Sequence, residues 1–298
     1  MNDGVLFFPV TPFDGNDRVD GELLGRHVAE RVADGAAAVF AACGTGEFHA
    51  LSHGEYETAV AAAVAATGGA VPVVAGTGGP LGHAKDCARS ADRLGADGLL
   101  VMPPYLVGGP QRGLVAYVEA LAATTELPLI VYHRGSATFT PESIEALLRI
   151  PSVVGVKDGV GDVAAAQQFV RVAAASGRQV LFFNGLLTAE LSQAAYRAIG
   201  VPLYSSAVFA MAPEIATAFF VAHRDGDSKH TAALLDGFYS PLVRLRDETP
   251  GFAVSLIKTG LRLSGLPVGS VRAPLVDPSP EQTDRLAALL DRGRELVA

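Results

Sequence analysis

Short apolar runs alternate along the chain with longer stretches that have a helical period. The runs are continuously apolar, which favours strands buried on both faces and therefore parallel strands. Eight such runs begin at Val5, Ala37, Val71, Asp97, Leu127, Val153, Val180 and Val201. Between them, residues 55–66, 84–94 and 164–175 have the apolar spacing of amphipathic helices. The pattern therefore predicts a chain of alternating strands and helices.

This alternation also predicts the fold class. About eight strand–helix units in roughly 225 residues match a closed (β/α)8 TIM barrel better than an open doubly wound sheet. The rest of the chain has three further helical patterns, at residues 231–245, 253–263 and 281–296. We therefore predict an α/β protein with a (β/α)8 barrel over residues 1–226. Residues 227–298 are predicted to form a C-terminal helical extension that packs on the barrel.

Composition removes several classes of function. The formal net charge of the 298 residues is −8 and no Lys/Arg-rich run occurs, so no nucleic-acid partner is expected. No apolar stretch approaches the roughly 20 residues of a membrane-spanning helix, and no secretory signal is evident, so we expect a cytoplasmic protein without membrane attachment. Two cysteines, Cys43 and Cys87, do not make a disulfide framework. The seven histidines lack HxxxH and HxH spacing, so no metal site is predicted.

Polar side chains gather where the predicted strands end, which is where barrel enzymes carry their catalytic groups. In chain order these residues are Gly44, Thr45, Gly46, Glu47, Tyr105, Tyr132, Lys157, Ser205 and Ser206. His133 and Arg134 follow Tyr132, and only one of two successive strand residues can face the barrel interior.

Lys157 is the most informative of these residues, because it follows Val153, Val154 and Val156 in a strand that is expected to be buried. An unpaired buried ammonium group is costly, so burial favours the neutral amine. A neutral amine can condense with a substrate ketone to form a Schiff base, whose iminium accepts electrons. The alternative is a structural lysine that pairs with Asp158 or another carboxylate.

The other strand-end residues each have two interpretations. The turn over residues 44–47 either presents backbone amides to a carboxylate or is simply a tight turn that needs glycine. Tyr132 and Tyr105 either relay protons or pack with one satisfied hydrogen bond. Cys43 has no evident partner base and is expected to be a small core residue.

Together these motifs resemble the dihydrodipicolinate synthase/N-acetylneuraminate lyase superfamily of Schiff-base barrel enzymes. The shared elements are the GTGE turn, a tyrosine that closes the fifth strand and a GVKD lysine that closes the sixth. ACGTGEFHALS, MPPYL, GVKDGVGD, YSSAVF and VRAPL are similar to the 5-dehydro-4-deoxyglucarate dehydratase branch, and this likeness covers almost the whole chain. Residues 133–137, HRGSA, and 209–214, FAMAPE, depart from that branch's usual NRDNA and FNF.PE. These departures concern the distal part of the substrate.

The resemblance implies a role for each matching residue. Lys157 forms the imine and Tyr132 is the catalytic tyrosine of the fifth strand. Residues 44–47 hold the carboxylate of a 2-oxo acid, and Tyr105, Ser205 and Ser206 line the site.

The implied reaction is the dehydration and decarboxylation of 5-dehydro-4-deoxy-D-glucarate, a small 2-oxo diacid, to 2,5-dioxopentanoate. It needs no metal or organic cofactor, because the imine accepts the electrons, and relatives suggest a homodimer or homotetramer. One alternative is a pyruvate-dependent aldolase of the same superfamily. Another is a barrel that binds keto acids without catalysis. A metal-dependent barrel enzyme is the weakest alternative, because it would need clustered carboxylates or histidines and the sequence shows none.

Overall fold

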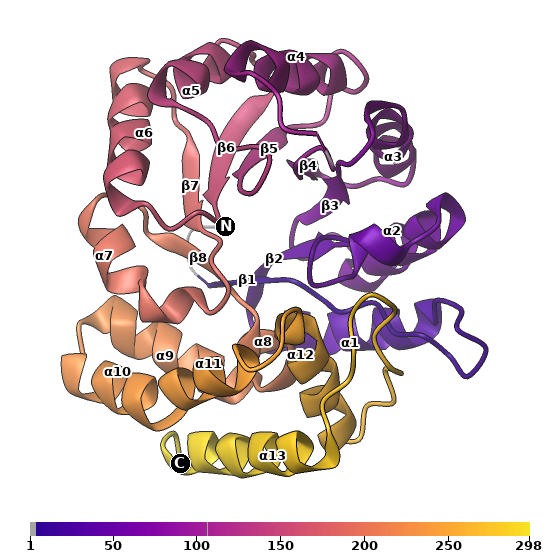
Figure 1. The fold of residues 1–298 in the computed structure, drawn as a ribbon, viewed down its shortest axis with the longest axis vertical. Coiled ribbons are helices and arrows are strands. Elements are labelled where there is room, and N and C mark those ends of the chain that lie inside the picture. The colour runs from indigo at the N-terminus through magenta and orange to yellow at the C-terminus, as the bar shows by residue number, and fades with distance from the viewer. Residues whose placement is uncertain (1–3, 106) are drawn as a thin grey trace.

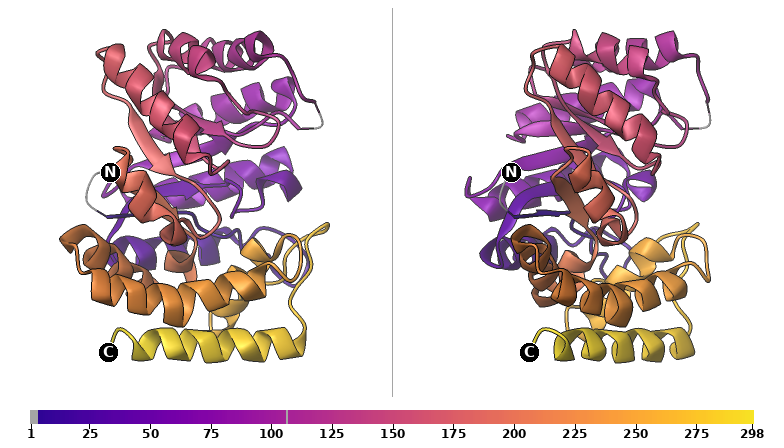
Figure 2. Two further views of the ribbon diagram at one scale, coloured as in Figure 1. Left: turned by 60° about the vertical axis from the view of Figure 1, so that its left-hand side comes forward. Right: turned by 90° about the vertical axis from the view of Figure 1, so that its left-hand side faces the viewer.

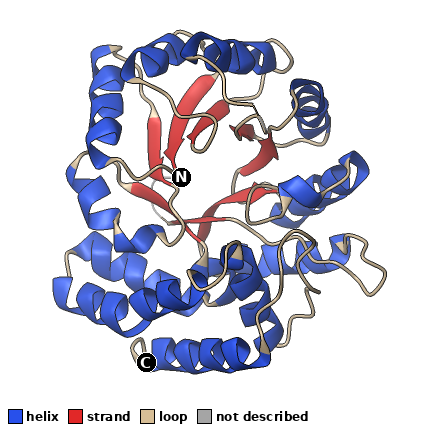
Figure 3. Cartoon of the chain, in the orientation of Figure 1, coloured by secondary structure: helices blue, strands red, loops and turns tan. Residues whose placement is uncertain are grey.

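The fold is a closed eight-stranded parallel barrel surrounded by helices, as predicted (Figures 1 and 3). The computed structural model describes residues 4–105 and 107–298, so Leu106 of the MPPYL motif lies outside the described part. The strands are β1 (Val5–Phe7), β2 (Ala36–Ala41), β3 (Val73–Thr77), β4 (Gly98–Val101), β5 (Leu129–His133), β6 (Val153–Asp158), β7 (Leu181–Asn184) and β8 (Leu203–Ser206). All eight predicted strands are therefore confirmed, each within a few residues of the apolar run that predicted it.

The helices between the strands begin at local capping signals. Asp20, Thr140 and Asp162 each accept a hydrogen bond from the first turn of the helix that follows, and Ser52 forms a capping box with Glu55. The helices are α1 (Gly21–Ala33), α2 (His53–Thr67), α3 (Leu81–Arg93), α4 (Gln111–Ala122), α5 (Pro141–Leu148), α6 (Val163–Ala175), α7 (Gln193–Ala198), α8 (Val208–Met211) and α9 (Pro213–Asp225). Two 3-10 turns, η1 (Phe48–Ala50) and η2 (Ala189–Leu191), interrupt the loops after β2 and β7.

The C-terminal helices gather on one side of the barrel (Figure 2). They are α10 (Ser228–Leu234), a π-helical turn η3 (Leu235–Tyr239), α11 (Ser240–Arg246), α12 (Phe252–Leu263) and α13 (Pro280–Glu295). Helix α12 packs on α8, and α13 packs on α9 and α12. The predicted division at residues 226 and 227 falls between α9 and α10 and stays a prediction.

Strand register brings the predicted site residues together. Tyr132 on β5 is paired with Lys157 on β6, which is paired in turn with Phe183 on β7. Inside the barrel, Phe8 stacks on Phe40 with ring centroids 4.4 Å apart, and Phe40 lies 5.6 Å from Phe183. These rings fill the interior beneath the carboxyl ends of the strands.

Glycines in the GTGGP motif allow the turn after β2 to lie against β3. A Cβ atom at Gly76 would lie 2.2 Å from the carbonyl oxygen of Ala42, and one at Gly78 would lie 2.9 Å from Met102. Real Cβ atoms do not approach so closely, so these two positions require glycine. The motif is thus explained by close backbone packing beside the site.

Within the described residues, no helix combines the length and the apolar character that crossing a membrane requires.

Candidate active site

A cavity of about 580 Å³ opens at the carboxyl ends of the strands. This is the end at which barrel enzymes carry their active sites. The predicted site residues that line it are Gly44, Thr45, Tyr105, Tyr132, Lys157 and Ser205. The structure therefore brings residues from four strand ends and the turn after β2 into one site.

Lys157 lies at the buried end of this cavity and is 5% exposed. Its Nζ lies 3.9 Å from the ring centroid of Phe8 and 4.5 Å from that of Tyr132. Burial lowers the pKa of Lys157 to about 7, and the nearby Arg134 guanidinium acts in the same direction. The amine is therefore substantially neutral at neutral pH.

Asp158 is not the partner that a structural lysine would need. It follows Lys157 on β6, and its carboxylate accepts hydrogen bonds from the Val160 N–H and the Tyr196 hydroxyl. Successive strand residues face opposite sides, so Asp158 points away from the barrel interior. The geometry favours the nucleophilic interpretation of Lys157.

Gly185, just after β7, makes room for the lysine side chain. A Cβ atom there would lie 2.2 Å from Cε and 2.5 Å from Cγ of Lys157. The Gly185 carbonyl also accepts a hydrogen bond from the Tyr132 hydroxyl at 3.0 Å. One glycine therefore sets the positions of both residues.

Tyr132 stands beside the lysine with its hydroxyl held on two sides. It donates to Gly185 and accepts from the Arg134 guanidinium at 2.8 Å. Burial raises the pKa of Tyr132, although Arg134 opposes this effect. The phenol therefore keeps its proton at neutral pH and can act as an acid.

Strand alternation also decides between His133 and Arg134. Arg134 lines the cavity. His133 points to the outside of the barrel, where its Nδ1 accepts the Phe139 N–H at 2.8 Å and its ring packs on Phe169. Of the two, Arg134 therefore faces the cavity and His133 does not.

The turn after β2 offers unused backbone donors to the cavity. Ala42 and Glu47, at its two ends, have φ values of 48° and 55°, which few non-glycine residues adopt. Within the described part of the chain, the amide N–H groups of Gly44 and Thr45 donate to no other group. Paired amides of this kind can form a nest for an anion such as a carboxylate, and these two amides are called the carboxylate nest below.

The other half of this turn faces away from the cavity, contrary to the expectation that all four residues contact substrate. The Gly46 carbonyl accepts a hydrogen bond from the buried Thr11 hydroxyl at 2.7 Å. The Glu47 carboxylate is buried, lies 2.6 Å from Lys258 Nζ on α12 and accepts the Arg272 N–H at 2.8 Å. Glu47 therefore holds the turn from behind.

The successive residues Ser205 and Ser206 also differ in whether their side chains face the cavity. Ser205 lines the cavity, whereas the buried Ser206 hydroxyl donates to Glu190 at 2.5 Å. Burial raises the pKa of Glu190 to about 7. Of the two serines, only Ser205 reaches the cavity.

Arg246 is a cavity residue that the sequence did not predict. It comes from α11 and donates to the Leu187 carbonyl at 2.8 Å and to the Thr188 hydroxyl at 2.9 Å. It follows directly on the helical pattern predicted for residues 231–245 and carries no local signal of function. Arg134 and Arg246 both line the cavity, and the Nε of Arg246 is also paired with Asp247 at 2.7 Å.

Comparisons with known proteins show what this chain is similar to. A family model described as the dihydrodipicolinate synthetase family matches residues 1–292. A protein of Streptomyces coelicolor called probable 5-dehydro-4-deoxyglucarate dehydratase 1 is 52% identical over 99% of this chain and 94% of its own length. One of the same name from Azotobacter vinelandii is 42% identical over 97% of this chain and 95% of its own. The crystal structure of dihydrodipicolinate synthase from Oceanobacillus iheyensis has the same fold, with a TM-score of 0.89 and 24% identity over 98% of this chain and 96% of that one.

Proposed function

The chain belongs to the dihydrodipicolinate synthetase family, and from this premise we propose that it is a decarboxylating 5-dehydro-4-deoxyglucarate dehydratase. The products are 2,5-dioxopentanoate, carbon dioxide and water. The observation that carries the proposal is the buried Lys157 amine, which lines one cavity together with Gly44, Thr45, Arg134 and Arg246. Relatives with this name at 42–52% identity over nearly the whole chain support it.

The first step attaches the substrate to Lys157. Numbering starts at the keto-acid end. The amides of Gly44 and Thr45 hold the C1 carboxylate and so orient the ketone. The neutral Lys157 amine attacks C2, and loss of water gives an iminium.

The iminium then makes elimination possible. Loss of a C3 proton gives an enamine, and the C4 hydroxyl leaves as water. The Tyr132 phenol is the proposed acid for this leaving group, because it keeps its proton at neutral pH. The result is an unsaturated iminium conjugated from C2 to C4.

This conjugation explains how one site carries out both reactions. The C5–C6 bond breaks with loss of carbon dioxide, and its electrons pass through C4, C3 and C2 to the cationic nitrogen. Protonation of the dienamine, tautomerisation of the C5 enol and hydrolysis of the imine release 2,5-dioxopentanoate. The lysine is regenerated, and one carbon dioxide and one net water are lost.

Arg134 and Arg246 are the proposed partners of the distal C6 carboxylate. Both guanidinium groups face the cavity, and Arg246 is fixed by two hydrogen bonds to the loop after β7. Planar guanidinium groups suit carboxylates, since they bind them through two parallel hydrogen bonds. This pair would select a diacid over pyruvate.

The test is incubation with 5-dehydro-4-deoxyglucarate, with and without borohydride. The wild type should release one carbon dioxide per substrate, and borohydride should trap an adduct on Lys157. Lys157→Ala should lose both, whereas Lys229→Ala, at an exposed lysine on α10, should keep both. Pyruvate release without carbon dioxide would assign the chain to the aldolases. If borohydride traps neither 5-dehydro-4-deoxyglucarate nor pyruvate on Lys157, the chain would instead be a barrel that binds keto acids without catalysis.

A homodimer or homotetramer in the cytoplasm belongs to the same proposal. Both cysteines are free and buried, in keeping with a reducing compartment. Light scattering on the purified protein measures the assembly state directly, and a monomer would contradict it.

A further inference from the structure

Three potential metal ligands converge on the outer layer of the barrel, between α2 and α3. His53 is the first residue of α2, and His83 and Cys87 lie one turn apart on α3. The nearest ligand atoms of the three all lie within 4.8 Å of one another. None of the three lines the cavity around Lys157.

Two of the three separations between ligand atoms are close to those of a tetrahedral zinc site. Cys87 Sγ lies 3.5 Å from His83 Nε2 and 4.0 Å from His53 Nδ1. With metal–sulfur and metal–nitrogen bonds of about 2.3 and 2.0–2.1 Å, tetrahedral sulfur and nitrogen ligands are separated by about 3.5–3.6 Å. One contact already has this length, and the other needs a shift of a few tenths of an ångström.

The surroundings of His53 orient it as a ligand. Its Nε2 lies 3.1 Å from the Ser90 hydroxyl and 3.4 Å from a Glu57 carboxylate oxygen. That oxygen also accepts hydrogen bonds from Ser90 and Arg93, so the carboxylate is fixed in place. With its proton on Nε2, the ring directs the Nδ1 lone pair toward Cys87. A carboxylate behind the outer nitrogen is the usual support of a metal-bound histidine.

We propose that His53, His83 and Cys87 bind one zinc-class transition-metal ion, with water as the fourth ligand. A thiolate and two imidazoles favour zinc, cobalt or copper over magnesium or calcium. The simpler interpretation is that the Cys87 thiol makes weak hydrogen bonds to the two imidazoles, and the metal-binding test below distinguishes the two. Sequence spacing did not predict the site because its ligands come from two helices.

The ion would join α2 to α3 behind the carboxylate nest. Phe48 follows Glu47 directly, and its ring lies 5.7 Å from that of His83 and 6.0 Å from that of Tyr56. Metal binding would therefore hold the rings that pack around Phe48, which follows the nest in the chain. We expect it to raise the thermal midpoint of the protein.

Cobalt(II) is the probe that tests the proposal. Added to chelator-treated protein, one equivalent should give a thiolate-to-cobalt charge-transfer band and intense visible bands of tetrahedral cobalt. Cys87→Ser should lose the charge-transfer band, and His83→Gln should weaken cobalt binding at least tenfold. Glu57→Gln should weaken it about 10–100-fold, as loss of a supporting carboxylate does.

Matched variants make the outcome decisive. Cys43→Ala removes the other cysteine, and His230→Gln removes a histidine on α10; both should keep the wild-type spectrum. Zinc should raise the thermal midpoint of the wild type but not that of Cys87→Ser. The proposal is overturned if the wild type shows no charge-transfer band, or if the band survives in Cys87→Ser.

Discussion

The reactivity proposed for Lys157 depends on its immediate neighbours. Aromatic rings of Phe8 and Tyr132 replace water around the amine, and the positive charge of Arg134 lies near it. The loss of water and the charge of Arg134 disfavour the ammonium form, although the faces of the rings attract it. The same side chain on an exposed helix would stay charged and unreactive at neutral pH.

Imine formation should therefore increase with pH through a pKa of about 7. At pH 6 only about a tenth of the amine is neutral when its pKa is near 7. Arg134→Gln removes a nearby positive charge and so raises the pKa of Lys157. The increase in imine formation should therefore occur at higher pH in this variant. The measurement is the rate of borohydride trapping with pyruvate, which has no distal carboxylate for Arg134 to bind. Arg112→Gln, at an exposed residue on α4, is the control. If the trapping rate of Arg134→Gln rises at the same pH as that of the wild type, the argument is contradicted.

At this scale the sequence predicted which residues approach the site but not which way all of them point. Lys157 and Tyr132 were predicted because strand ends and alternation are local properties. Glu47 and Ser206 were misplaced, because their buried partners, Lys258 and Glu190, are invisible to local patterns. The orientation of a turn residue depends on what packs behind it.

Strands β6 and β7 work as one unit, because the side chain of Lys157 occupies the space that a glycine leaves free. We predict that Gly185→Ala reduces imine formation about 100-fold, since a displacement of about 1 Å has effects of this size. Overpacking should cost only about 1–3 kcal/mol of stability, so the variant should still fold. Borohydride trapping and thermal unfolding, measured together, separate the two effects.

Gly82→Ala is the matched control, because a Cβ atom there meets nothing within 4 Å. It should trap substrate like the wild type. Equal trapping in Gly185→Ala and Gly82→Ala would show that the close contact with Lys157 is relieved without consequence.

Most elements could be predicted from periodicity, whereas their irregularities could not. The helical pattern at residues 231–245 is present as α10 and α11, but a π-helical turn at Leu235–Tyr239 joins them. That turn has no signature in the apolar spacing. This turn precedes α11, and Arg246 at the end of α11 lines the cavity. Because the apolar spacing does not show how α11 is oriented, the sequence did not predict Arg246 as a site residue.

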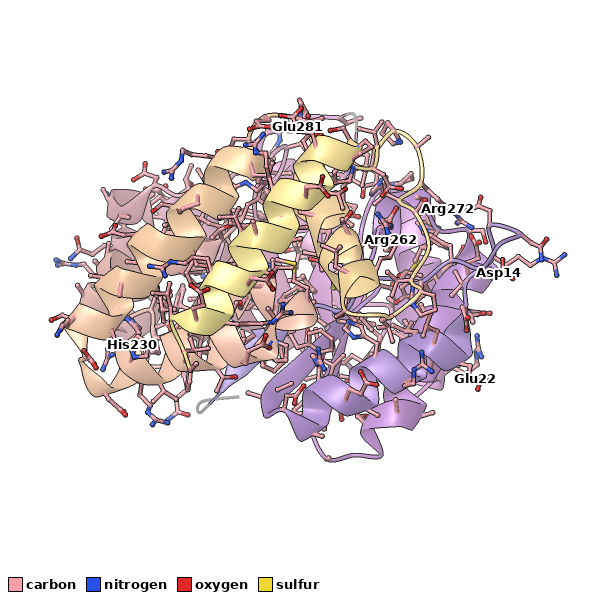
Figure 4. The ribbon with its side chains drawn as sticks, turned by 90° about the horizontal axis from the view of Figure 1, so that it is seen from below. Asp14, Glu22, His230, Arg262, Arg272 and Glu281 are labelled. Carbon is pink, nitrogen blue, oxygen red and sulfur yellow. The ribbon has the colours of Figure 1, made fainter. Side chains whose placement is uncertain are left out.

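Over the whole molecule, the C-terminal segment holds the carboxylate nest in place. Figure 4 shows Arg272 on the loop before α13, on the same side as the N-terminal elements. Its guanidinium contacts Asp17 and Glu55, and its N–H binds Glu47. Lys258 completes the set with a wholly buried ion pair to Glu47.

Breaking this ion pair should be costly. Lys258→Met or Glu47→Gln alone leaves a buried group without its partner and should destabilise the fold by about 3–5 kcal/mol. The double variant should lose less than the sum of the two, because neither charge is then left alone. Urea unfolding of the four proteins measures the coupling. Lys229→Met should match the wild type, and strictly additive losses would argue against the pairing.

The hydrogen bond from Arg272 to Glu47 also bears on the order in which the protein is made. It joins residues 225 positions apart, so during translation Lys157 and Tyr132 leave the ribosome well before the segment that completes the nest. Since a chain emerges from its N-terminus, a nascent barrel would carry its nucleophile without a fixed place for the substrate carboxylate. Activity would then begin only once Arg272, which precedes α13, had also left the ribosome.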